Sequence, residues 1–331
     1  MIETVYIEAE IKDHPKTREI LARFPDARRI AIERYGEVFN RKSQNFRLQK
    51  IKPALILAKK YGKFVLEVPE SYGIGASRNY YFSHMLNCLY DCRYCFLQGM
   101  YESAHYVLFV NYEDFKQAMD ETIAASPEPV HFFSGYDCDS LALESVTGFA
   151  AEFLEFFASR PQALIELRTK SIQIKPLLSR QAMDNCVTAF TLTPREVAEA
   201  VEHSAPSLEQ RLRAMEQLQE CGWKLGLRFD PVIYSEDFQR QYEELFGEVF
   251  RRIRIEQIHS VTLGPFRLPK DIFERMYKLY PDEKLLAGPL KDEKGMVTYP
   301  QAIQERLSER VREGLLRHIP ENLLFEAKTP V

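Results

Sequence analysis

The sequence predicts an α/β fold built as a partial (β/α)6 barrel, with a small α/β extension before it and a helical segment after it. From about residue 106, short apolar segments alternate with amphipathic helical segments, as in parallel sheets with crossover helices. About six such units can be traced, too few for a closed eightfold barrel. The chain is 45% hydrophobic and 28% charged, which permits a sizeable core.

The expected elements follow from residue periodicity. In the extension, strands are expected at 2–8 and 28–33, and a helix at 16–24. Later strands are expected at 106–110, 130–133, 163–167, 186–192, 225–229 and 261–263. Helices are expected after the capping residue Asn111, at 141–159, after the capping box of Ser207 and Gln210, at 238–253 and at 300–318. Residues 71–81, with two glycines, are expected to form a loop.

We divide the chain at residue 80. Residues 1–80 form the N-terminal α/β extension, and residues 81–331 form the barrel with a C-terminal cap. The extension contains a basic strip, residues 41–63, with eight Lys or Arg and no Asp or Glu. Such a strip could follow a phosphate backbone, or it could be a solvated face beside the apolar segment 54–58. Because the net charge is −4, a nucleic acid would have to bind at a local patch of this kind.

Three features of the sequence bear on the cellular location of the protein. The N-terminus has no basic flank followed by a long apolar run, and no segment approaches transmembrane length. Three of the six cysteines are clustered and three are dispersed, which does not resemble a disulfide framework. We therefore expect a cytoplasmic protein without membrane contact.

The most informative segment holds three cysteines within eight residues. Cys88, Cys92 and Cys95 have the spacing Cys-x3-Cys-x2-Cys. Thiolates on so short a loop converge on one side and could bind three corners of a cubic [4Fe–4S] cluster. The fourth iron would then be open to a small molecule. The alternative is a structural zinc site with His84 as the fourth ligand.

The segment Cys88-x3-Cys92-x-Tyr94-Cys95 resembles the signature of radical S-adenosylmethionine (radical SAM) enzymes. In that superfamily the open iron chelates the amino and carboxylate groups of S-adenosylmethionine. The resemblance implies a [4Fe–4S] cluster and S-adenosylmethionine as cofactors. It also implies that the partial barrel is a TIM-type barrel of the radical SAM type.

Polar segments follow several of the predicted strands, at the end where barrel enzymes carry their sites. These segments are 134–140, 169–171, 191–193 and 228–231. In the first, Cys138 lies between Asp137 and Asp139, where we expect it to be exposed. The two acids should raise its pKa and keep it a thiol, which can donate a hydrogen atom to a carbon radical. The alternative is a small buried apolar residue, and this is what we expect of Cys186 and Cys221.

Together these features resemble the spore photoproduct lyase family over nearly the whole chain. The segments that carry the resemblance are Cys88 to Gln98, Cys138 followed by Ser140, Leu167 to Lys170, Phe190-Thr191 and Pro231 to Tyr234. It implies that three residues hold the cluster: Cys88, Cys92 and Cys95. It implies that four residues lie around S-adenosylmethionine: Tyr94, Ser140, Lys170 and Thr191. Cys138 would be the hydrogen-atom donor, with Tyr94 helping to return the radical to the cofactor.

The resemblance further implies a radical SAM carbon–carbon lyase that acts in DNA repair. Reductive cleavage of S-adenosylmethionine would give a 5′-deoxyadenosyl radical, which would start the reversal of a cross-linked thymine dimer, the spore photoproduct. DNA and an electron donor such as ferredoxin or flavodoxin would be the partners.

The chain departs from the family pattern in its substrate-binding half. Phe96 stands where the known repair enzymes have a tyrosine whose hydroxyl is assigned to the radical relay. The segment Lys294 to Tyr299 lacks the arginine of the family's Arg-Tyr pair, and Leu263 to Arg267 replaces a His-Arg segment. These differences favour a second hypothesis, in which the same radical machinery acts on another nucleic-acid modification or another substrate.

Overall fold

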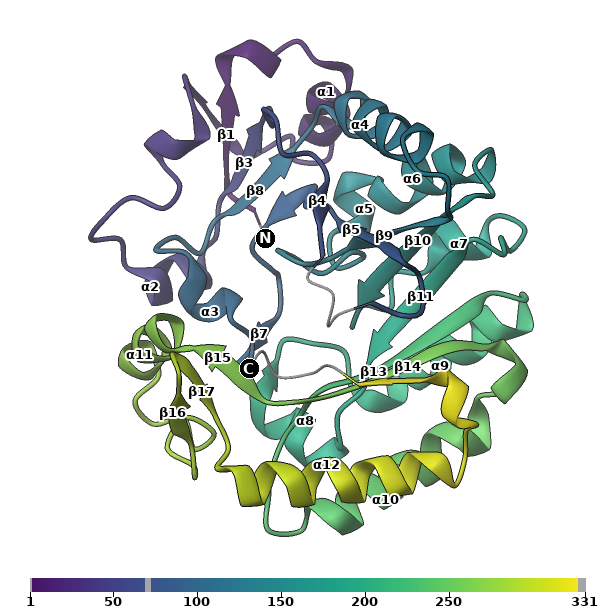
Figure 1. Cartoon of the computed structure of the whole chain (residues 1–331). Coiled ribbons are helices and arrows are strands. Elements are labelled where there is room, and N and C mark those ends of the chain that lie inside the picture. The colour runs from purple at the N-terminus through teal and green to yellow at the C-terminus, as the bar shows by residue number, and fades with distance from the viewer. Residues whose placement is uncertain (1, 69–72, 327–331) are drawn as a thin grey trace.

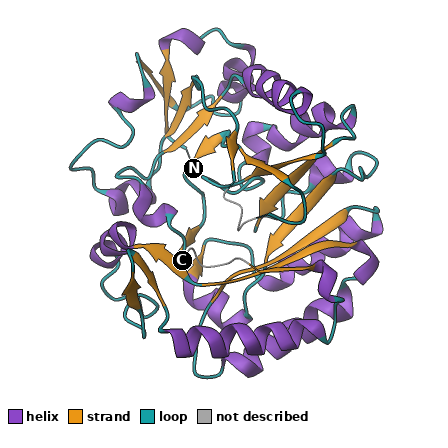
Figure 2. Ribbon diagram, viewed as in Figure 1, coloured by secondary structure: helices purple, strands orange, loops and turns teal. Residues whose placement is uncertain are grey.

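The computed structural model describes residues 2–68 and 73–326. Its largest element is a curled eight-stranded sheet with helices on its outer face (Figure 1, Figure 2). In spatial order its strands are β18 (Leu324–Glu326), β14 (Ile258–Pro265), β13 (Lys224–Val232), β11 (Cys186–Thr191), β10 (Ala163–Thr169), β9 (Val130–Ser134), β5 (Arg78–Tyr81) and β4 (Leu66–Glu67). All neighbours are parallel except β4 and β5. The predicted partial barrel is confirmed.

A second sheet lies beside the barrel at the N-terminal end of the chain (Figure 1). Its strands, in spatial order, are β2 (Arg28–Ile32), β1 (Thr4–Glu8), β3 (Leu55–Ala58), β8 (Tyr106–Phe109) and β6 (Met85–Leu86). Assigning residues 106–110 to the barrel was therefore wrong, because β8 pairs parallel with β3. All four β8 side chains are buried, so its apolar pattern could not distinguish between the two sheets.

Sequence reasoning missed three strands of the eight-stranded sheet, β4, β18 and β5, of which β5 is the longest. Strand β5 pairs parallel with β9 in the segment that was predicted as a loop. Its sequence, Arg-Asn-Tyr-Tyr, has no aliphatic residue, so nothing in its periodicity indicated a strand. Residues 71 and 72 of the predicted loop lie outside the described residues.

The helices are α1 (Pro15–Ala22), α2 (Phe46–Ile51), α3 (Leu97–Met100), α4 (Tyr112–Ala124), α5 (Glu144–Thr147), α6 (Phe149–Ala158), α7 (Lys175–Leu178), α8 (Arg195–Val201), α9 (Leu208–Glu220), α10 (Phe238–Arg252), α11 (Lys270–Leu279) and α12 (Gln301–Leu316). The predicted helices are found, with two local differences, and the structure adds α2, α3, α7, α8 and α11, which were not predicted. The helix predicted at 141–159 is broken by Gly148, whose φ of +57° ends α5 and starts α6. Asn111 precedes α4 but does not cap it, because its amide bonds the backbone N–H and C=O of Lys60 at 2.9 and 3.0 Å. The capping box of Ser207 and Gln210 is confirmed.

Two small sheets complete the fold. β7 (Asp91–Cys92) pairs antiparallel with β12 (Glu202–His203), and β16 (Lys291–Glu293), β17 (Met296–Thr298) and β15 (Arg267–Pro269) form a three-stranded sheet. Within residues 2–68 and 73–326, no helix combines the length and apolar character needed to cross a membrane.

A buried ion pair joins two barrel strands. Glu166 on β10 and Arg228 on β13 are both fully buried, with Oε2 and Nη2 2.7 Å apart. Arg228 also donates to the carbonyl and hydroxyl oxygens of Ser260 on β14, at 3.0 and 2.9 Å. Burial alone would raise the pKa of Glu166, but the charges of Arg228 and Arg168 lower it to about 2. The carboxylate therefore stays ionised inside the barrel.

We expect Arg228→Met to lower the free energy of unfolding by about 3–5 kcal/mol, because it leaves the Glu166 carboxylate buried without its partner. Urea unfolding measures this change.

In the wild type, the stability that ionised Glu166 contributes is complete above its ordinary pKa of 4.5 and is lost as pH falls toward 2. The stability difference between wild type and Glu166→Gln should shrink over that window, and a difference independent of pH would contradict this account.

Candidate active site

The three clustered cysteines lie on one loop, residues 87–96, which we call the cysteine loop. It begins at Asn87, whose φ is +70° and whose amide donates to the carbonyls of Ser103 and His105, both at 2.7 Å. In its middle, Cys92 pairs with Glu202 in the β7–β12 ladder. The N–H of Arg93 donates to the carbonyl of Val201 at 2.8 Å. The loop is thus fastened to the N-terminal sheet at its start and to the barrel in its middle.

The cysteine side chains of this loop are free thiols. Cys92 is buried, and Cys88 and Cys95 are half-buried. Burial raises the pKa of all three thiols, that of Cys92 to about 12. The positive charge of Lys170 acts against this for Cys92 and Cys95. The charges of Cys92 and Cys95 also raise the pKa of Cys88.

The described residues offer no site for a single metal ion. Among the described residues, no three His, Cys, Asp or Glu side chains gather so that they could hold one ion. A cubic cluster does not require such a point, because each thiolate binds its own iron. His84 does not support the zinc alternative: its ring stacks on Phe149 at 3.7 Å, and burial lowers its pKa to about 3.

The cysteine loop contacts a buried carboxylate, that of Glu202. This carboxylate accepts hydrogen bonds from the Tyr94 hydroxyl and, at 2.9 Å, from the Thr193 hydroxyl. It also pairs with the Arg211 guanidinium, which donates to the carbonyl of Thr191 at 3.0 Å. Burial alone would raise the pKa of Glu202, but Arg211 and Lys170 lower it, so the group is ionised. The side chain of Tyr94 is therefore fixed by a charge-assisted hydrogen bond.

Sequence reasoning missed both Glu202 and Arg211. One signal was available: Arg211 lies three residues after Leu208 and one before Leu212, on the apolar face of α9. A charged residue on a buried helical face needs a buried partner. Glu202 itself carried no such signal, because it lies in the short segment between α8 and α9.

The four predicted cofactor-binding residues lie at the carboxyl ends of barrel strands or on the cysteine loop. The Lys170 ammonium lies 5.2 Å from the centre of the Tyr94 ring. Thr191 ends β11, where its carbonyl binds Arg211. Ser140 follows β9, and its Oγ lies 2.7 Å from Ser134 Oγ. Their contact with S-adenosylmethionine stays a prediction.

The loop that carries Cys138 is held tightly at the mouth of the barrel. Gly135 has φ +81°, and a Cβ there would lie 2.7 Å from Ser140 Oγ and 2.9 Å from the Arg168 carbonyl oxygen. Asp139 turns inward and accepts hydrogen bonds from the Thr169 hydroxyl and the Lys170 N–H, both at 2.6 Å. These two hydrogen bonds pull the loop into the barrel. Because a Cβ at position 135 would clash with both oxygen atoms named above, this conformation of the loop requires glycine there.

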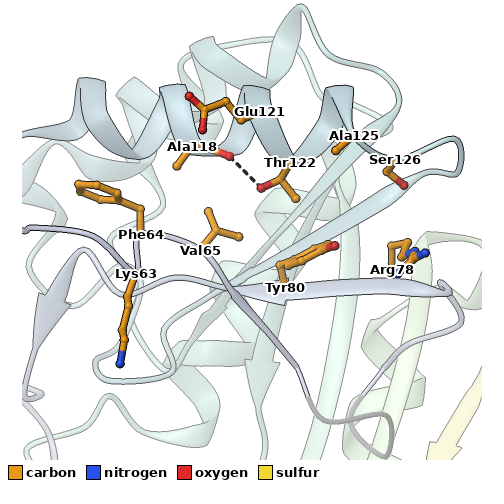
Figure 3. A pocket seen from close by; sticks show the side chains of 10 residues that line it. All are labelled: Lys63, Phe64, Val65, Arg78, Tyr80, Ala118, Glu121, Thr122, Ala125 and Ser126. Atoms are coloured by element: carbon orange, nitrogen blue, oxygen red, sulfur yellow. Dashed lines mark hydrogen bonds between the residues drawn. The ribbon is translucent and has the colours of Figure 1, made fainter.

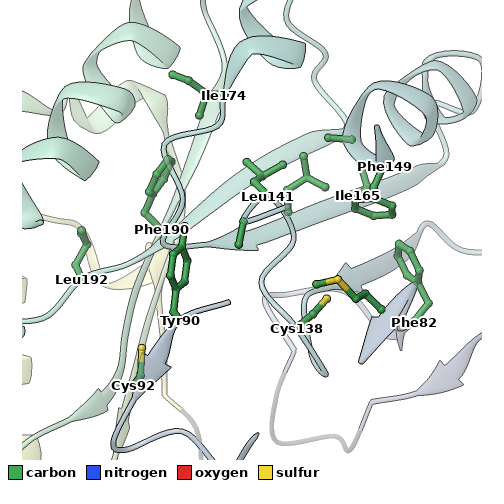
Figure 4. Packing of buried hydrophobic residues seen from close by; sticks show 14 of the residues in the cluster. Phe82, Tyr90, Cys92, Cys138, Leu141, Phe149, Ile165, Ile174, Phe190 and Leu192 are labelled. Carbon is green, nitrogen blue, oxygen red and sulfur yellow. The ribbon is translucent and has the colours of Figure 1, made fainter. Parts of the chain in front are cut away.

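Cys138 is only 5% exposed, so the prediction of an exposed thiol was wrong. Figure 4 draws it in the same buried cluster as Cys92, Phe82 and Leu141. Its pKa lies well above the ordinary value, as predicted, but burial is the main cause and the flanking acids are secondary. The charge of Cys88 acts in the same direction, which places the two sulfurs in one electrostatic neighbourhood. Cys138 is thus held as a neutral thiol near the cysteine loop.

The two remaining cysteines differ from each other. Cys186 is fully buried, as predicted. Cys221 is exposed, which contradicts the prediction of a buried residue. The helix ends at Glu220, so Cys221 takes the C-cap position and no longer continues the apolar face.

Aromatic rings connect the cysteine loop with the Cys138 loop. The rings of Phe96 and Tyr136 are 5.5 Å apart, and Tyr136 packs against Tyr81 at 4.7 Å. Phe96 follows Cys95 in the chain, and Tyr136 precedes Cys138 by two residues. Tyr136 is 53% exposed. These rings form an aromatic wall that reaches the surface beside the two cysteines.

A separate cavity of about 540 Å³ lies between β5 and α4 (Figure 3). Residues that line it include Lys63, Arg78, Tyr80 and Thr122, and none of the predicted site residues is among them. The Thr122 hydroxyl donates to the carbonyl of Ala118 at 2.8 Å, within its own helix. In Figure 3 the Lys63 side chain points away from α4. We assign no role to this cavity.

Comparison with known proteins decides the family. The family profile described as "Spore photoproduct lyase" matches residues 1–301. The chain belongs to the spore photoproduct lyase family of radical SAM enzymes. Its relatives include the spore photoproduct lyases of Clostridium acetobutylicum, 24% identical over 76% of each chain, and of Bacillus subtilis strain 168, 23% identical over 85% of this chain and 83% of the relative.

Solved structures agree with the fold. A spore photoproduct lyase mutant with bound AdoMet and dinucleoside spore photoproduct has a TM-score of 0.84 at 20% identity, covering 100% of this chain and 99% of that one. A spore photoproduct lyase complexed with dinucleoside spore photoproduct has a TM-score of 0.82 at 20% identity, covering 99% and 98%. The similarity in fold thus extends over the barrel and the N-terminal sheet together.

The structure shows which contacts are made by the segments that depart from the family pattern. The hydroxyl of Tyr299 is buried and accepts the N–H of Tyr234 at 2.9 Å. Arg267 donates to the carbonyl of Pro265 at 3.0 Å and lies 3.7 Å from Asp230, at the end of the barrel. Arg267 is therefore the cation that this chain places at the end of β14.

We expect Glu202→Ala to lower the free energy of unfolding by about 3–5 kcal/mol, because it leaves the Arg211 guanidinium buried and unpaired. Glu196→Ala is the matched control, since Glu196 pairs with Arg240 on the surface and its loss should cost far less. Urea unfolding of the apoprotein measures both. Equal effects of the two substitutions would show that Glu202 does not anchor the site.

Proposed function

We propose that this protein is a radical SAM lyase that reverses the spore photoproduct, a thymine dimer in DNA, with Cys138 as the hydrogen-atom donor. One observation carries the proposal: the loop with three free cysteines and the loop with the buried Cys138 lie against each other, with the rings of Phe96 and Tyr136 5.5 Å apart. Family membership supports the same reaction. So do the relatives' structures, which hold AdoMet and a dinucleoside spore photoproduct.

The residues present fit the implied cofactors. Cys88, Cys92 and Cys95 would hold a [4Fe–4S] cluster, and the bound cluster would supply the electron that splits S-adenosylmethionine into methionine and a 5′-deoxyadenosyl radical. Lys170, half-buried beside Tyr94, would offer its ammonium to the ligand's carboxylate. Ser140 and Thr191 would contribute hydroxyl groups near the same ligand.

Cys138 suits the role of donor for a physical reason. A thiolate has no S–H hydrogen to give, whereas the environment of Cys138 keeps the thiol protonated at neutral pH. The hydrogen-bonded Asp139 fixes the loop, so the sulfur is held in place before substrate arrives. The thiol would transfer its hydrogen to the product radical and become a thiyl radical.

DNA and a ferredoxin- or flavodoxin-type electron donor are the proposed partners, in the cytoplasm. Only some of the cationic side chains of the basic strip are available to bind phosphates. Lys59 pairs with Glu10 and Lys52 with Glu3, so these charges are already engaged. Exposed members such as Arg47 remain on the surface. A duplex lesion would have to be drawn out of the base stack to reach the mouth of the barrel.

The second candidate keeps the radical chemistry but changes the substrate. Phe96 has no hydroxyl, and Tyr299 turns its own hydroxyl inward to the backbone of Tyr234. A different nucleic-acid modification, or another substrate, would then occupy the space beside Tyr136.

We expect Cys88→Ala, Cys92→Ala and Cys95→Ala each to lose most of the bound iron after anaerobic reconstitution, because each removes one of three cluster ligands. Cys186→Ala and Cys221→Ser are the controls and should keep wild-type iron. Iron analysis and the brown absorbance measure the outcome. Retained iron in the loop variants, or bound zinc in a colourless wild type, would contradict the assignment.

With reductant, S-adenosylmethionine and a synthetic spore-photoproduct dinucleotide, we expect the reconstituted protein to form 5′-deoxyadenosine and thymidine dinucleotide. In Cys138→Ala, 5′-deoxyadenosine should persist while clean repair falls at least about tenfold, because the product radical loses its hydrogen donor. Chromatography of both products makes the measurement. Deoxyadenosine without repair in the wild type would favour the second candidate.

A further inference from the structure

One residue of the basic strip reaches the cysteine loop. Lys50 lies in the last turn of α2, and its ammonium donates to the carbonyl oxygens of Cys88 at 3.0 Å and Tyr90 at 3.3 Å. Both hydrogen bonds are partly buried. An ammonium has three N–H donors, so two of the three are used on this loop. Lys50 is therefore turned toward the cysteines and is poorly placed to grip a phosphate.

The helix that carries Lys50 is itself firmly placed. Asn45 caps it by accepting the N–H of Leu48 at 3.0 Å. The neighbouring Gln49 accepts the N–H of Ala104 at 2.9 Å and the hydroxyl of Ser103 at 3.2 Å. The carbonyl of Ser103 in turn binds Asn87, the first residue of the cysteine loop. Helix, loop and the segment after α3 thus form one hydrogen-bonded unit.

We propose that Lys50 is a positioning residue that fixes the cysteine loop and raises the reduction potential of the cluster bound there. This inference rests on the proposed function, since it needs the cluster that Cys88, Cys92 and Cys95 would hold.

The electrostatic part follows from the sign of the charge. A partly buried ammonium interacts more strongly with nearby charge than one in bulk water. The Lys50 ammonium lies 3.0 Å from the carbonyl oxygen of Cys88, one of the proposed cluster ligands. Reduction adds one electron to the cluster, so a nearby cation favours the reduced form. Removing the cation should therefore lower the reduction potential.

The test compares Lys50→Met with Lys52→Met. Methionine keeps the length and apolar stem of lysine but removes the charge and the donors. Lys52 is the matched control, because it caps the same helix but is 72% exposed and pairs with Glu3. Redox titration of the reconstituted proteins, followed by electron paramagnetic resonance, gives the potential. We expect the reduced-to-oxidised ratio at fixed potential to fall about tenfold in Lys50→Met, which is about 59 mV for a one-electron couple, and to stay unchanged in Lys52→Met.

A second readout does not need the cluster. Hydrogen exchange of the backbone amides of residues 88–95 in the apoprotein should become at least about tenfold faster in Lys50→Met and unchanged in Lys52→Met, because the two carbonyl contacts are lost. Lys50→Arg keeps the charge and donors and should restore most of both effects.

The outcomes separate the two proposals. A wild-type protein that takes up no iron overturns the proposed function and the redox role with it, while the exchange rates still decide whether Lys50 fixes the loop. A wild-type protein with a cluster whose potential is the same in Lys50→Met overturns this inference and leaves the proposed function standing. Weaker DNA binding in Lys50→Met with unchanged potential and exchange would make Lys50 a phosphate contact instead.

Discussion

The site depends on one buried carboxylate, that of Glu202. A charge removed from water is costly unless several partners satisfy it, and Glu202 has partners from three different parts of the chain. Tyr94 comes from the cysteine loop, Thr193 follows a barrel strand, and Arg211 comes from α9. Arg211 cannot move away without leaving an unpaired buried charge, and Tyr94 and Thr193 cannot move away without taking a hydrogen bond from that charge. The cysteine loop is thereby fixed on the open barrel, in addition to the β7–β12 ladder and the Arg93–Val201 hydrogen bond.

A second buried carboxylate does the same for the loop of Cys138, the proposed hydrogen donor. Asp139 holds the Cys138 loop through Thr169 and the backbone N–H of Lys170. The side chain of the same lysine acts electrostatically on Glu202. Lys170 therefore joins the two anchors, its backbone bonded to one and its charge directed at the other. A ligand carboxylate bound by this ammonium would lie between the cysteine loop and the donor thiol.

Sequence patterns predicted those features that depend on neighbours in the chain. The spacing of Cys88, Cys92 and Cys95 and the strand–helix alternation are local, and so is the capping box of α9. What failed depends on distant partners. Strand β8 has an apolar pattern that suits either sheet, and only its pairing with β3 assigned it. The burial of Cys138 follows from hydrogen bonds that Asp139 makes to β10 and the residue after it, which no periodicity encodes.

The contacts of Glu202 bear on the consequence of having Phe96 in place of a tyrosine. Without a phenol there, Tyr94 is the tyrosine that remains in the motif, and its hydroxyl is committed to Glu202. To give up a hydrogen, Tyr94 would have to break a charge-assisted bond beside a carboxylate whose pKa Arg211 and Lys170 hold down against the effect of burial. Such a group is a poor proton acceptor, so return of the radical through Tyr94 is disfavoured. For this reason we treat cofactor cleavage and substrate repair as separate steps of the proposed reaction. The protein could split S-adenosylmethionine while the radical returns by a route other than Tyr94.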